Sequence, residues 1–200
     1  ISLNTMGRAA LDALVARERF ERVLALEARD VGRDFAFAER PEEPLLLLRA
    51  DAMTICRPRL REILAEDVPI TWGVHVRTLD DVPRGDLVVA ADGAASAVRE
   101  AMRAHVDVPR LRPTGIHTVA GYVPRTREWD RRLPLQREGA VQYFGPAGQT
   151  MFVSCCERED GTPMILWALS QHAEHVEPAA GWHPTLRDLV AASPSLTERM

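Results

Sequence analysis

The chain has 200 residues, a formal net charge of −4 at pH 7 and 46% hydrophobic residues. This length suits one domain, or a domain with a smaller companion, and the apolar content is enough for a core. All 25 basic residues are Arg, and no basic run stands out, which argues against a nucleic-acid-binding protein.

No stretch reaches the roughly 18 apolar residues that a membrane span requires, and no signal peptide is recognisable. The three cysteines, Cys56, Cys155 and Cys156, do not make a disulfide framework, and we expect them to be small buried hydrophobic residues. These features favour a reducing, cytoplasmic setting. Because the chain begins at Ile1 rather than Met, we expect it to be part of a longer protein.

The first part of the chain predicts both helices and strands. Asn4 or Thr5 can cap a first helix, and Pro58 suits the first turn of a later one. By apolar periodicity, helices are expected at 4–15, 57–66 and 94–105, and strands at 34–39, 45–49, 53–56, 69–79 and 86–91. The charged stretch 16–30 is expected to form a short helix or a turn.

The second part is mostly strand-like until a final helix. Asp160-Gly161 lies between two β-like runs and predicts a hairpin turn. His183 can cap the helix that follows it, whose first turn holds Pro184. We expect an antiparallel sheet of about four strands, at 114–124, 139–145, 150–157 and 164–170, and a helix at 183–193. An α/β domain with an inserted sheet layer is the simplest arrangement.

The stretch "DLVVAADGAASAVRE" joins an apolar run, a tight turn and a helix. Such an apolar run is typical of a strand covered on both faces. Asp92 and Gly93 would then stand at the carboxyl end of that strand, the edge where α/β sheets bind ligands. Gly93 permits close approach of the backbone, and the helix start offers N–H groups to an anion. The alternative is that Asp92 only caps the helix beginning near Ala94 or Ala95.

Three cations open the predicted helix at 57–66, where the helix dipole disfavours positive charge. They are Arg57, Arg59 and Arg61. A phosphate or pyrophosphate would compensate them, because Arg binds phosphate bidentately. The alternative is a salt bridge to a nearby Asp or Glu.

Together these two units resemble the flavoprotein monooxygenases of the para-hydroxybenzoate hydroxylase type. In that family an Arg-x-x-Leu helix precedes a fingerprint of a charged residue, a hydrophobic run, two small residues, Asp-Gly, and then Ser and Arg. Arg57 and Leu60 fit the helix. The fingerprint positions are filled by Asp86, residues 87–89, Ala90-Ala91, Asp92-Gly93, Ser96 and Arg99. The flanking stretches 1–14 and 181–194 are also similar to the family, so the resemblance covers essentially the whole chain.

The resemblance implies FAD as cofactor and NAD(P)H as reductant. Arg57 would contact the pyrophosphate or ribityl region of FAD. Asp92 would hydrogen-bond the ribityl–pyrophosphate region, and Gly93 would allow the approach. Ser96 would cap or steady the turn, and Arg99 would brace the motif.

The implied fold is α/β with α+β elements: an incomplete Rossmann-like FAD/NAD(P)-binding domain with an inserted, mainly antiparallel sheet on the substrate side. Residues 1–110 would belong to the FAD-binding domain, 111–171 to the sheet, and 172–200 to a helix returning to the first domain. The backbone of Val76 would lie near the adenine. The family's GxGxxG and its later Gly-Asp motif are absent from these 200 residues, so we expect the middle of a longer enzyme.

In such enzymes the cofactor carries the chemistry, so we expect no catalytic nucleophile or triad in this chain. Tyr143, Phe144 and Trp167 are candidates to line a substrate pocket, with sheet core as the alternative. His172 and His175 are three residues apart, but no further ligands with suitable spacing accompany them, so we expect no metal site.

The leading hypothesis is therefore a segment of an FAD-dependent monooxygenase. It would hydroxylate a small organic, aromatic substrate with O₂ and NAD(P)H through a C4a-hydroperoxyflavin, without nucleic-acid or membrane partners. One alternative is a related flavin-fold enzyme, a halogenase or a reductase. Another is a truncated, non-catalytic remnant that acts at most as a binding module. The oligomeric state and the choice of NADH or NADPH stay open.

Overall fold

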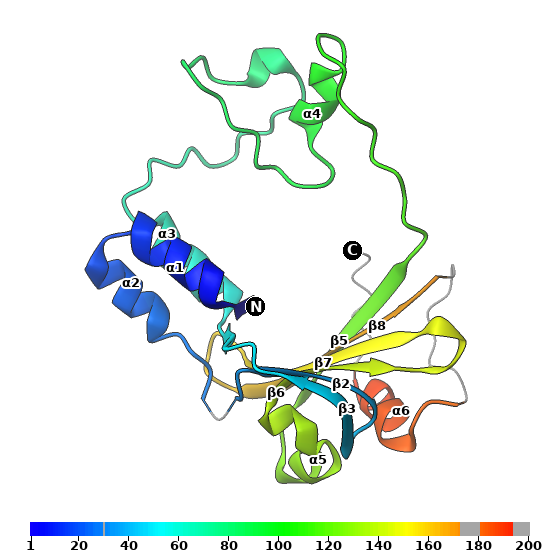
Figure 1. The fold of residues 1–200 in the computed structure, drawn as a ribbon. Helices are drawn as coiled ribbons and strands as arrows, with labels where there is room; N and C mark the ends of the chain where they lie inside the picture. Colours follow the sequence, from blue (N-terminus) through cyan, green and yellow to red (C-terminus); the bar gives the residue numbers. More distant parts are fainter. Residues whose placement is uncertain (30, 173–180, 194–200) are drawn as a thin grey trace. The chain divides into compact units, whose positions relative to one another are not determined.

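The computed structural model describes residues 1–29, 31–172 and 181–193. The chain divides into two compact units (Figure 1). The larger, called the sheet unit, comprises Ile1–Glu66 and Gly115–Met200, and the smaller, called the turn unit, comprises Asp67–Thr114. Within the described part of the chain, no helix is long and apolar enough to cross a membrane.

A six-stranded mixed sheet lies at the centre of the sheet unit, in the order β3-β2-β6-β7-β8-β5. Its strands are β2 Asp34–Arg40, β3 Glu43–Leu48, β5 His117–Pro124, β6 Gly139–Phe144, β7 Thr150–Glu157 and β8 Pro163–Gln171. β2 and β6 are parallel, and the other neighbouring strands are antiparallel. The expectation of about four antiparallel strands was thus wrong in extent, because the β2–β3 hairpin from the first part of the chain joins the sheet.

The parallel pairing of β2 with β6 depends on a glycine at its start. Gly139 has φ +146°, and a Cβ there would lie 1.9 Å from the carbonyl oxygen of Asp34. The backbone N–H of Asp34 donates to the carbonyl oxygen of Glu138 at 2.8 Å. Only glycine allows the two backbones to meet this closely, so this position fixes where the hairpin joins the sheet.

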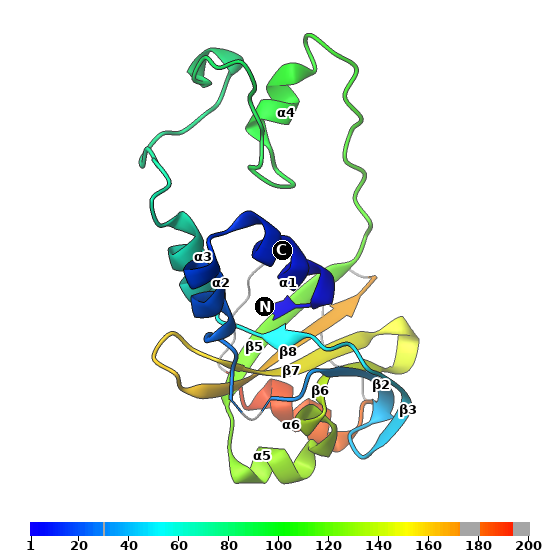
Figure 2. The ribbon, with the colours of Figure 1, turned by 60° about the vertical axis from the view of Figure 1, so that its left-hand side comes forward.

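Helices α5 (Arg127–Arg132) and α6 (Pro184–Ala191) cover one face of the sheet (Figure 2). Leu186 and Leu189 of α6 are fully buried in the main hydrophobic core. This core also includes alternate side chains of β2, β5, β6, β7 and β8. As expected, His183 caps α6: its Nδ1 accepts from the backbone N–H of Thr185 at 3.3 Å. The core therefore lies between the sheet and α6, with the 3₁₀ turn η2 (Pro134–Arg137) beside it.

Three further helices lie on the other side of the sheet (Figures 1 and 2). They are α1 Thr5–Leu14, α2 Arg17–Leu24 and α3 Arg57–Ala65, as the sequence predicted. The Asn4 side chain caps α1, accepting from the backbone N–H of Gly7 at 2.9 Å. β4 (Met53–Thr54) lies within the strand expected at 53–56, and it pairs with β1 (Ser2–Leu3), which the sequence did not predict. A second, smaller core of Val23, Met53, Ile55, Leu60 and Ile63 holds this layer together.

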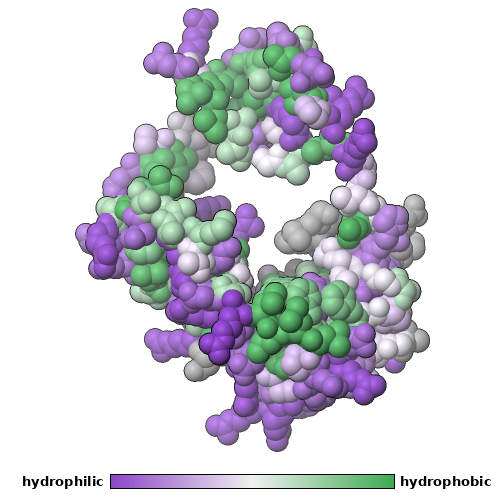
Figure 3. Space-filling model, viewed as in Figure 1, coloured by the Kyte–Doolittle hydropathy of each residue, from purple (hydrophilic) through white to green (hydrophobic). Residues whose placement is uncertain are grey.

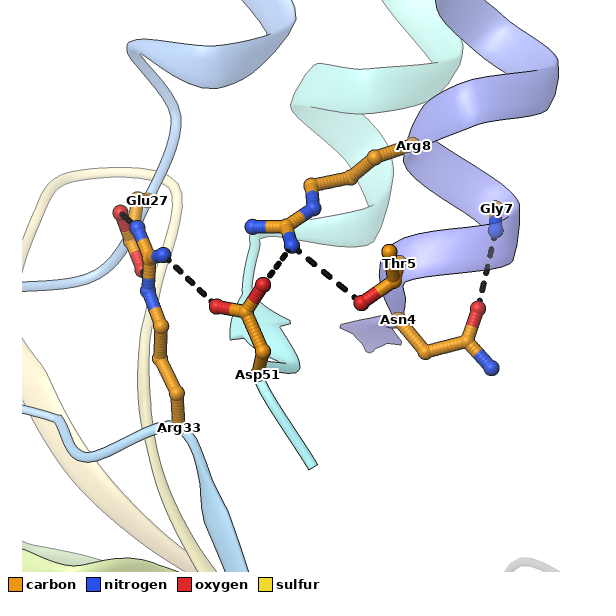
Figure 4. A network of polar contacts seen from close by, with 7 residues as sticks. All are labelled: Asn4, Thr5, Gly7, Arg8, Glu27, Arg33 and Asp51. Atoms are coloured by element: carbon orange, nitrogen blue, oxygen red, sulfur yellow. Dashed lines mark hydrogen bonds and ion pairs between the residues drawn. The ribbon is translucent and has the colours of Figure 1, made fainter. Parts of the chain in front are cut away.

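A polar network connects α1 to the segment that leads into the sheet (Figure 4). Asp51 accepts from Arg8 of α1 and, at 2.9 Å, from Arg33, and Arg33 also binds both carboxylate oxygens of Glu27 at 2.6 Å. Asp51 has φ +44°, in the left-handed region that costs a non-glycine residue energy. The Arg8 and Arg33 hydrogen bonds lower the pKa of the Asp51 carboxyl below its usual value.

The turn unit differs most from the sequence-based expectation. In it the structure has only the 3₁₀ turn η1 (Leu79–Asp81) and α4 (Ala97–Met102), so the strands expected at 69–79 and 86–91 were wrong. Leu87 and Val89 are 83% and 76% exposed. A strand needs neighbours to accept its backbone hydrogen bonds, and Asp67–Thr114 supplies no other strand.

Two smaller predictions can also be checked. The hairpin turn at Asp160-Gly161 is confirmed between β7 and β8, with Gly161 at φ +80°. Of the cysteines, only Cys155 is fully buried, and burial raises the pKa of its thiol to about 11. Cys56 and Cys156 are half-buried, so the expectation of three buried cysteines was wrong for these two.

Two helical leucines test the position of the core. Leu189 in α6 is fully buried, whereas Leu14 in α1 is 80% exposed. We expect Leu189→Ala to lower the free energy of unfolding by about 2–5 kcal/mol, because it leaves a cavity in the core. Leu14→Ala, the matched control, should change it by less than about 0.5 kcal/mol. Urea denaturation measures both, and equal effects would mean that α6 does not cover the core.

The Asp51 network should make stability depend on pH. Because the folded pKa of Asp51 is lowered, its stabilising contribution is present above the unfolded pKa of about 3.9 and is lost as pH falls through the folded pKa. We expect Asp51→Asn to lower the free energy of unfolding at pH 7. Below the folded pKa of Asp51, the variant and wild type should have the same free energy of unfolding. Asp12→Asn, on the exposed side of α1, serves as the control. A difference in free energy of unfolding between wild type and Asp51→Asn that stays constant with pH would contradict this prediction.

Candidate functional site

Arg57 begins α3, where the backbone N–H groups of the first turn lie free of a side-chain cap. The side chain is exposed, as are Arg59 and Arg61. Among residues 1–29, 31–172 and 181–193, none of these three arginines forms an ion pair, so the alternative of a salt bridge finds no partner there. Pro58 in this turn has no N–H, so positive charge coincides here with the uncapped N–H groups of Arg57 and Arg59, a combination that suits an anion.

The Asp-Gly turn of the turn unit is held by its own side chains. Asp92 Oδ2 accepts from the backbone N–H of Ala97 at 3.0 Å. Ser96 is the N-cap of α4, and its Oγ accepts from the backbone N–H of Arg99 at 2.9 Å. The Arg99 guanidinium donates back to the carbonyl oxygens of Gly93, at 3.4 Å, and Ala94. These contacts join the four sequence-predicted residues of the turn into one closed loop.

The electrostatics of this turn favour a charged carboxylate. A hydrogen bond with Ser96, followed by smaller backbone hydrogen bonds, lowers the pKa of Asp92 below its usual value. Gly93 has φ +86°, which excludes most other residues. Apart from its chain neighbours, no described residue has an atom within 4 Å of where its Cβ would be. The turn thus places the ionised Asp92 carboxylate next to Gly93, where the backbone carries no side chain.

The remaining cofactor candidate, Val76, is half-buried in an irregular segment of the turn unit. Arg57 belongs to the sheet unit, whereas Asp92, Gly93 and Arg99 belong to the turn unit. The contacts within the turn are therefore local, and Arg57 takes no part in them.

Two of the three aromatic candidates lie in the core. Tyr143 is fully buried, its hydroxyl is hydrogen-bonded to the Gln136 side chain at 3.1 Å, and burial raises its pKa. Trp167 is also buried, and its Nε1 donates to Ser193 Oγ at 2.6 Å. Gly121 on β5 lies flush against the Trp167 ring. Both rings face α6, as part of the core between it and the sheet.

Phe144 points to the opposite face of the sheet and is 42% exposed. Its ring stacks on Phe37 with centroids 5.8 Å apart and an angle of 6° between planes. Phe35 contacts Phe37 edge-on at 5.1 Å and stacks with Phe152 at 6.3 Å. Phe35, Phe37 and Phe152 were not among the residues predicted from the sequence. The alternation "FAF" shows that the first two share a face, but only the pairing of β2 with β6 brings them to Phe144.

This face, called the aromatic face, carries no charge along its strands up to the β-bulge that follows Phe37 in β2. In the observed register its positions are Phe35, Phe37, Leu46, Leu48, Thr118, Ala120, Tyr122, Ala140, Gln142, Phe144, Thr150, Phe152, Ser154, Cys156, Met164, Leu166, Ala168 and Ser170. Charged residues make up 27% of the whole chain. An antiparallel sheet face that meets water usually carries polar and charged residues. Figure 3 shows a hydrophobic area on the surface over β2 and β3.

A cavity of about 530 Å³ adjoins Phe144. Its lining also includes Trp182, whose ring is buried and whose Nε1 donates to Gln149 Oε1 at 2.5 Å. Gly145 lies flush against that ring, because a Cβ there would come within 2.2 Å of it. The other lining residues are Glu39, Arg40, Pro146, Gly181, His183 and Pro184. The volume falls in the range of small-molecule sites.

Of the two histidines considered for a metal, only His172 lies among the described residues. The Nε2 of His172 would lie 2.5 Å from a Cβ on Gly115, so its ring packs against that backbone. His175 lies outside the described residues. No group of three or more potential metal ligands occurs among the residues that are described.

No protein-family model and no curated protein matches the chain. A search of solved structures finds the crystal structure of a "putative FAD containing monooxygenase" from Photorhabdus luminescens subsp. laumondii TTO1, with a TM-score of 0.71 and 15% identity. The fold of this chain resembles part of an FAD monooxygenase. The match covers 98% of this chain and 62% of that one, so the chain spans less than two thirds of the solved protein. At this identity the likeness concerns the fold alone.

Proposed function

We propose that this chain is the middle part of an FAD-dependent, NAD(P)H-using monooxygenase that hydroxylates a small aromatic substrate with O₂. The observation that carries the proposal is the likeness in fold to a protein described as containing FAD, over 98% of this chain. The Arg-x-x-Leu helix and the Asp-Gly turn also support the proposal. They are features of the amino-acid sequence, whereas the likeness to the solved structure is one of backbone fold. The enzyme would work in the cytoplasm with a small molecule as its partner.

Each unit, taken by itself, holds residues that would suit part of a dinucleotide cofactor. Arg57 offers an exposed guanidinium beside the free N–H groups of α3, which suits the FAD pyrophosphate. Gly93 leaves open backbone for a close approach, and Asp92 would accept hydrogen bonds from the ribityl hydroxyl groups. Ser96 and Arg99 would act by holding the turn, and the Val76 backbone would meet the adenine. When bound, FAD would supply the redox chemistry with NAD(P)H and O₂.

The aromatic face supports an aromatic, uncharged substrate. Its stacked phenylalanines give a flat apolar surface, on which a ring packs in the offset or edge-on geometries that aromatic pairs prefer. A charged group placed there would lose its hydration without meeting a partner, which costs energy. The chain would thus orient the substrate ring and exclude water, and the cavity beside Phe144 would receive it.

The Asp92 assignment is tested by FAD affinity. In the protein that contains this chain, we expect Asp92→Ala to weaken FAD binding by about tenfold or more, because hydrogen bonds to a charged group are lost. Flavin fluorescence during titration measures this. Asp81→Ala is the matched control: Asp81 is also an exposed aspartate of the turn unit that accepts backbone hydrogen bonds, from Arg77 and Thr78. Equal FAD affinity in wild type and Asp92→Ala would show that Asp92 does not touch the cofactor.

The substrate proposal is tested with a pair of phenols that differ in charge. We expect neutral 4-methylphenol to stimulate NAD(P)H oxidation more than anionic 4-hydroxybenzoate. Phe144→Ala should weaken the response to 4-methylphenol by roughly tenfold, because a stacked ring surface is lost. The matched control is Tyr122→Ala, since Tyr122 is on the same face and 41% exposed but lies on the edge strand β5.

A preference for 4-hydroxybenzoate would contradict the proposal of an uncharged substrate. It would indicate that Arg40, which lines the cavity beside Phe144, binds the carboxylate. Product analysis with halide present separates hydroxylation from halogenation, and FAD reduction without product would indicate a reductase.

A further inference from the structure

A second cavity of the sheet unit has a different chemistry from the one beside Phe144. It measures about 850 Å³ and lies where the segment before β2, the start of α5 and the β7–β8 hairpin meet. Four arginines line it: Arg29, Arg125, Arg127 and Arg137. None of these arginines belongs to the proposed cofactor site or to the cavity beside Phe144.

Separate backbone contacts hold these arginines around the cavity. The backbone N–H of Arg29 donates to Glu157 Oε1 at 2.9 Å, and that of Arg125 donates to the Pro163 carbonyl oxygen at 3.0 Å. Gly32 brings the first segment against η2, because a Cβ there would lie 2.1 Å from the backbone of Glu138. This close approach, which only glycine permits, sets Arg29 and Arg137 on the same cavity.

Among the described residues that line the cavity, basic residues outnumber acidic ones. Four arginines stand there against two acidic residues, Asp130 and Glu157. Asp130 Oδ1 already accepts from Nε of Arg125 at 2.7 Å, and the Arg125 side chain is only 11% exposed. Within the described part of the chain, the side chains of Arg29, Arg127 and Arg137 form no ion pair.

We propose that this cavity binds an anion that carries a phosphate or diphosphate group. Arginine binds such groups bidentately, and several guanidinium groups around one cavity repel one another until an anion lies between them. The cavity has no tryptophan, tyrosine or phenylalanine in its lining, so it offers no stacking surface for a base. The phosphate group is therefore the part that this site recognises. The proposal does not depend on the proposed monooxygenase function.

Isothermal titration with inorganic pyrophosphate, at constant ionic strength, tests the proposal. We expect one bound pyrophosphate at the cavity, and we expect the double variant Arg127→Gln/Arg137→Gln to bind it at least about tenfold more weakly. Arg131→Gln is the matched control, because Arg131 is an exposed arginine of α5 that does not line the cavity. A thermal melt of each variant checks that it stays folded.

Further titrations distinguish binding in the cavity from binding at the proposed flavin site and from general charge attraction. Arg57→Gln should bind pyrophosphate at the cavity as wild type does. Loss of binding in Arg57→Gln with full binding in the double variant would place pyrophosphate at the proposed flavin site and overturn the cavity proposal. Citrate, which carries a similar negative charge near pH 7 but no phosphate, should bind more weakly than pyrophosphate at the same ionic strength. Equal affinity for the two anions would mean that the cavity attracts negative charge in general, and it would overturn the proposal of phosphate recognition. ADP, which carries the same diphosphate, should bind as pyrophosphate does if the phosphates alone are recognised, and tighter binding of ADP would overturn that part of the proposal.

Discussion

The parallel pairing of β2 with β6 is the contact on which the rest of the sheet unit depends. It adds the β2–β3 hairpin to the strands β5–β8, which are distant in sequence. The same pairing brings Phe35 and Phe37 beside Phe144 and Phe152. It also places the segment of Arg29 next to η2, which creates the arginine-lined cavity. Gly139 permits the pairing, since any side chain there would collide with the Asp34 backbone.

The two faces of the sheet follow different physical rules. One face is closed by α6 and η2, and its polar atoms are satisfied inside the core: Tyr143 by Gln136 and Trp167 by Ser193. Burial of a hydroxyl or an indole N–H is tolerated when it finds such a partner. The aromatic face is free of charge up to the β-bulge that follows Phe37 in β2, yet Phe144 and Tyr122 remain partly exposed on it. Exposed apolar surface of this kind commonly marks a binding site, which supports the proposal of an uncharged substrate ring.

The turn unit separates local from non-local structure. The Asp92–Arg99 turn closes through hydrogen bonds between residues at most six apart, so it forms without help from other strands. The apolar run at 87–89, in contrast, could form a strand only through contacts with distant parts of the sequence. It has the composition of a covered strand, but a strand forms only when neighbouring strands accept its backbone hydrogen bonds, and these come from distant sequence.

The sequence by itself determined the features that depend on near neighbours: the helix caps Asn4 and His183, the hairpin at Asp160-Gly161, and the strands β5 to β8. It also contained the Arg57 and Asp92 motifs. Only the tertiary structure decided which strands pair. For that reason it alone showed that Phe35 and Phe37 meet Phe144, that Tyr143 and Trp167 face the core, and that four arginines share one cavity. Periodicity predicts which side chains share one face of a strand or helix. Which other element packs or pairs beside it is decided by contacts between residues about a hundred positions apart, as between β2 and β6.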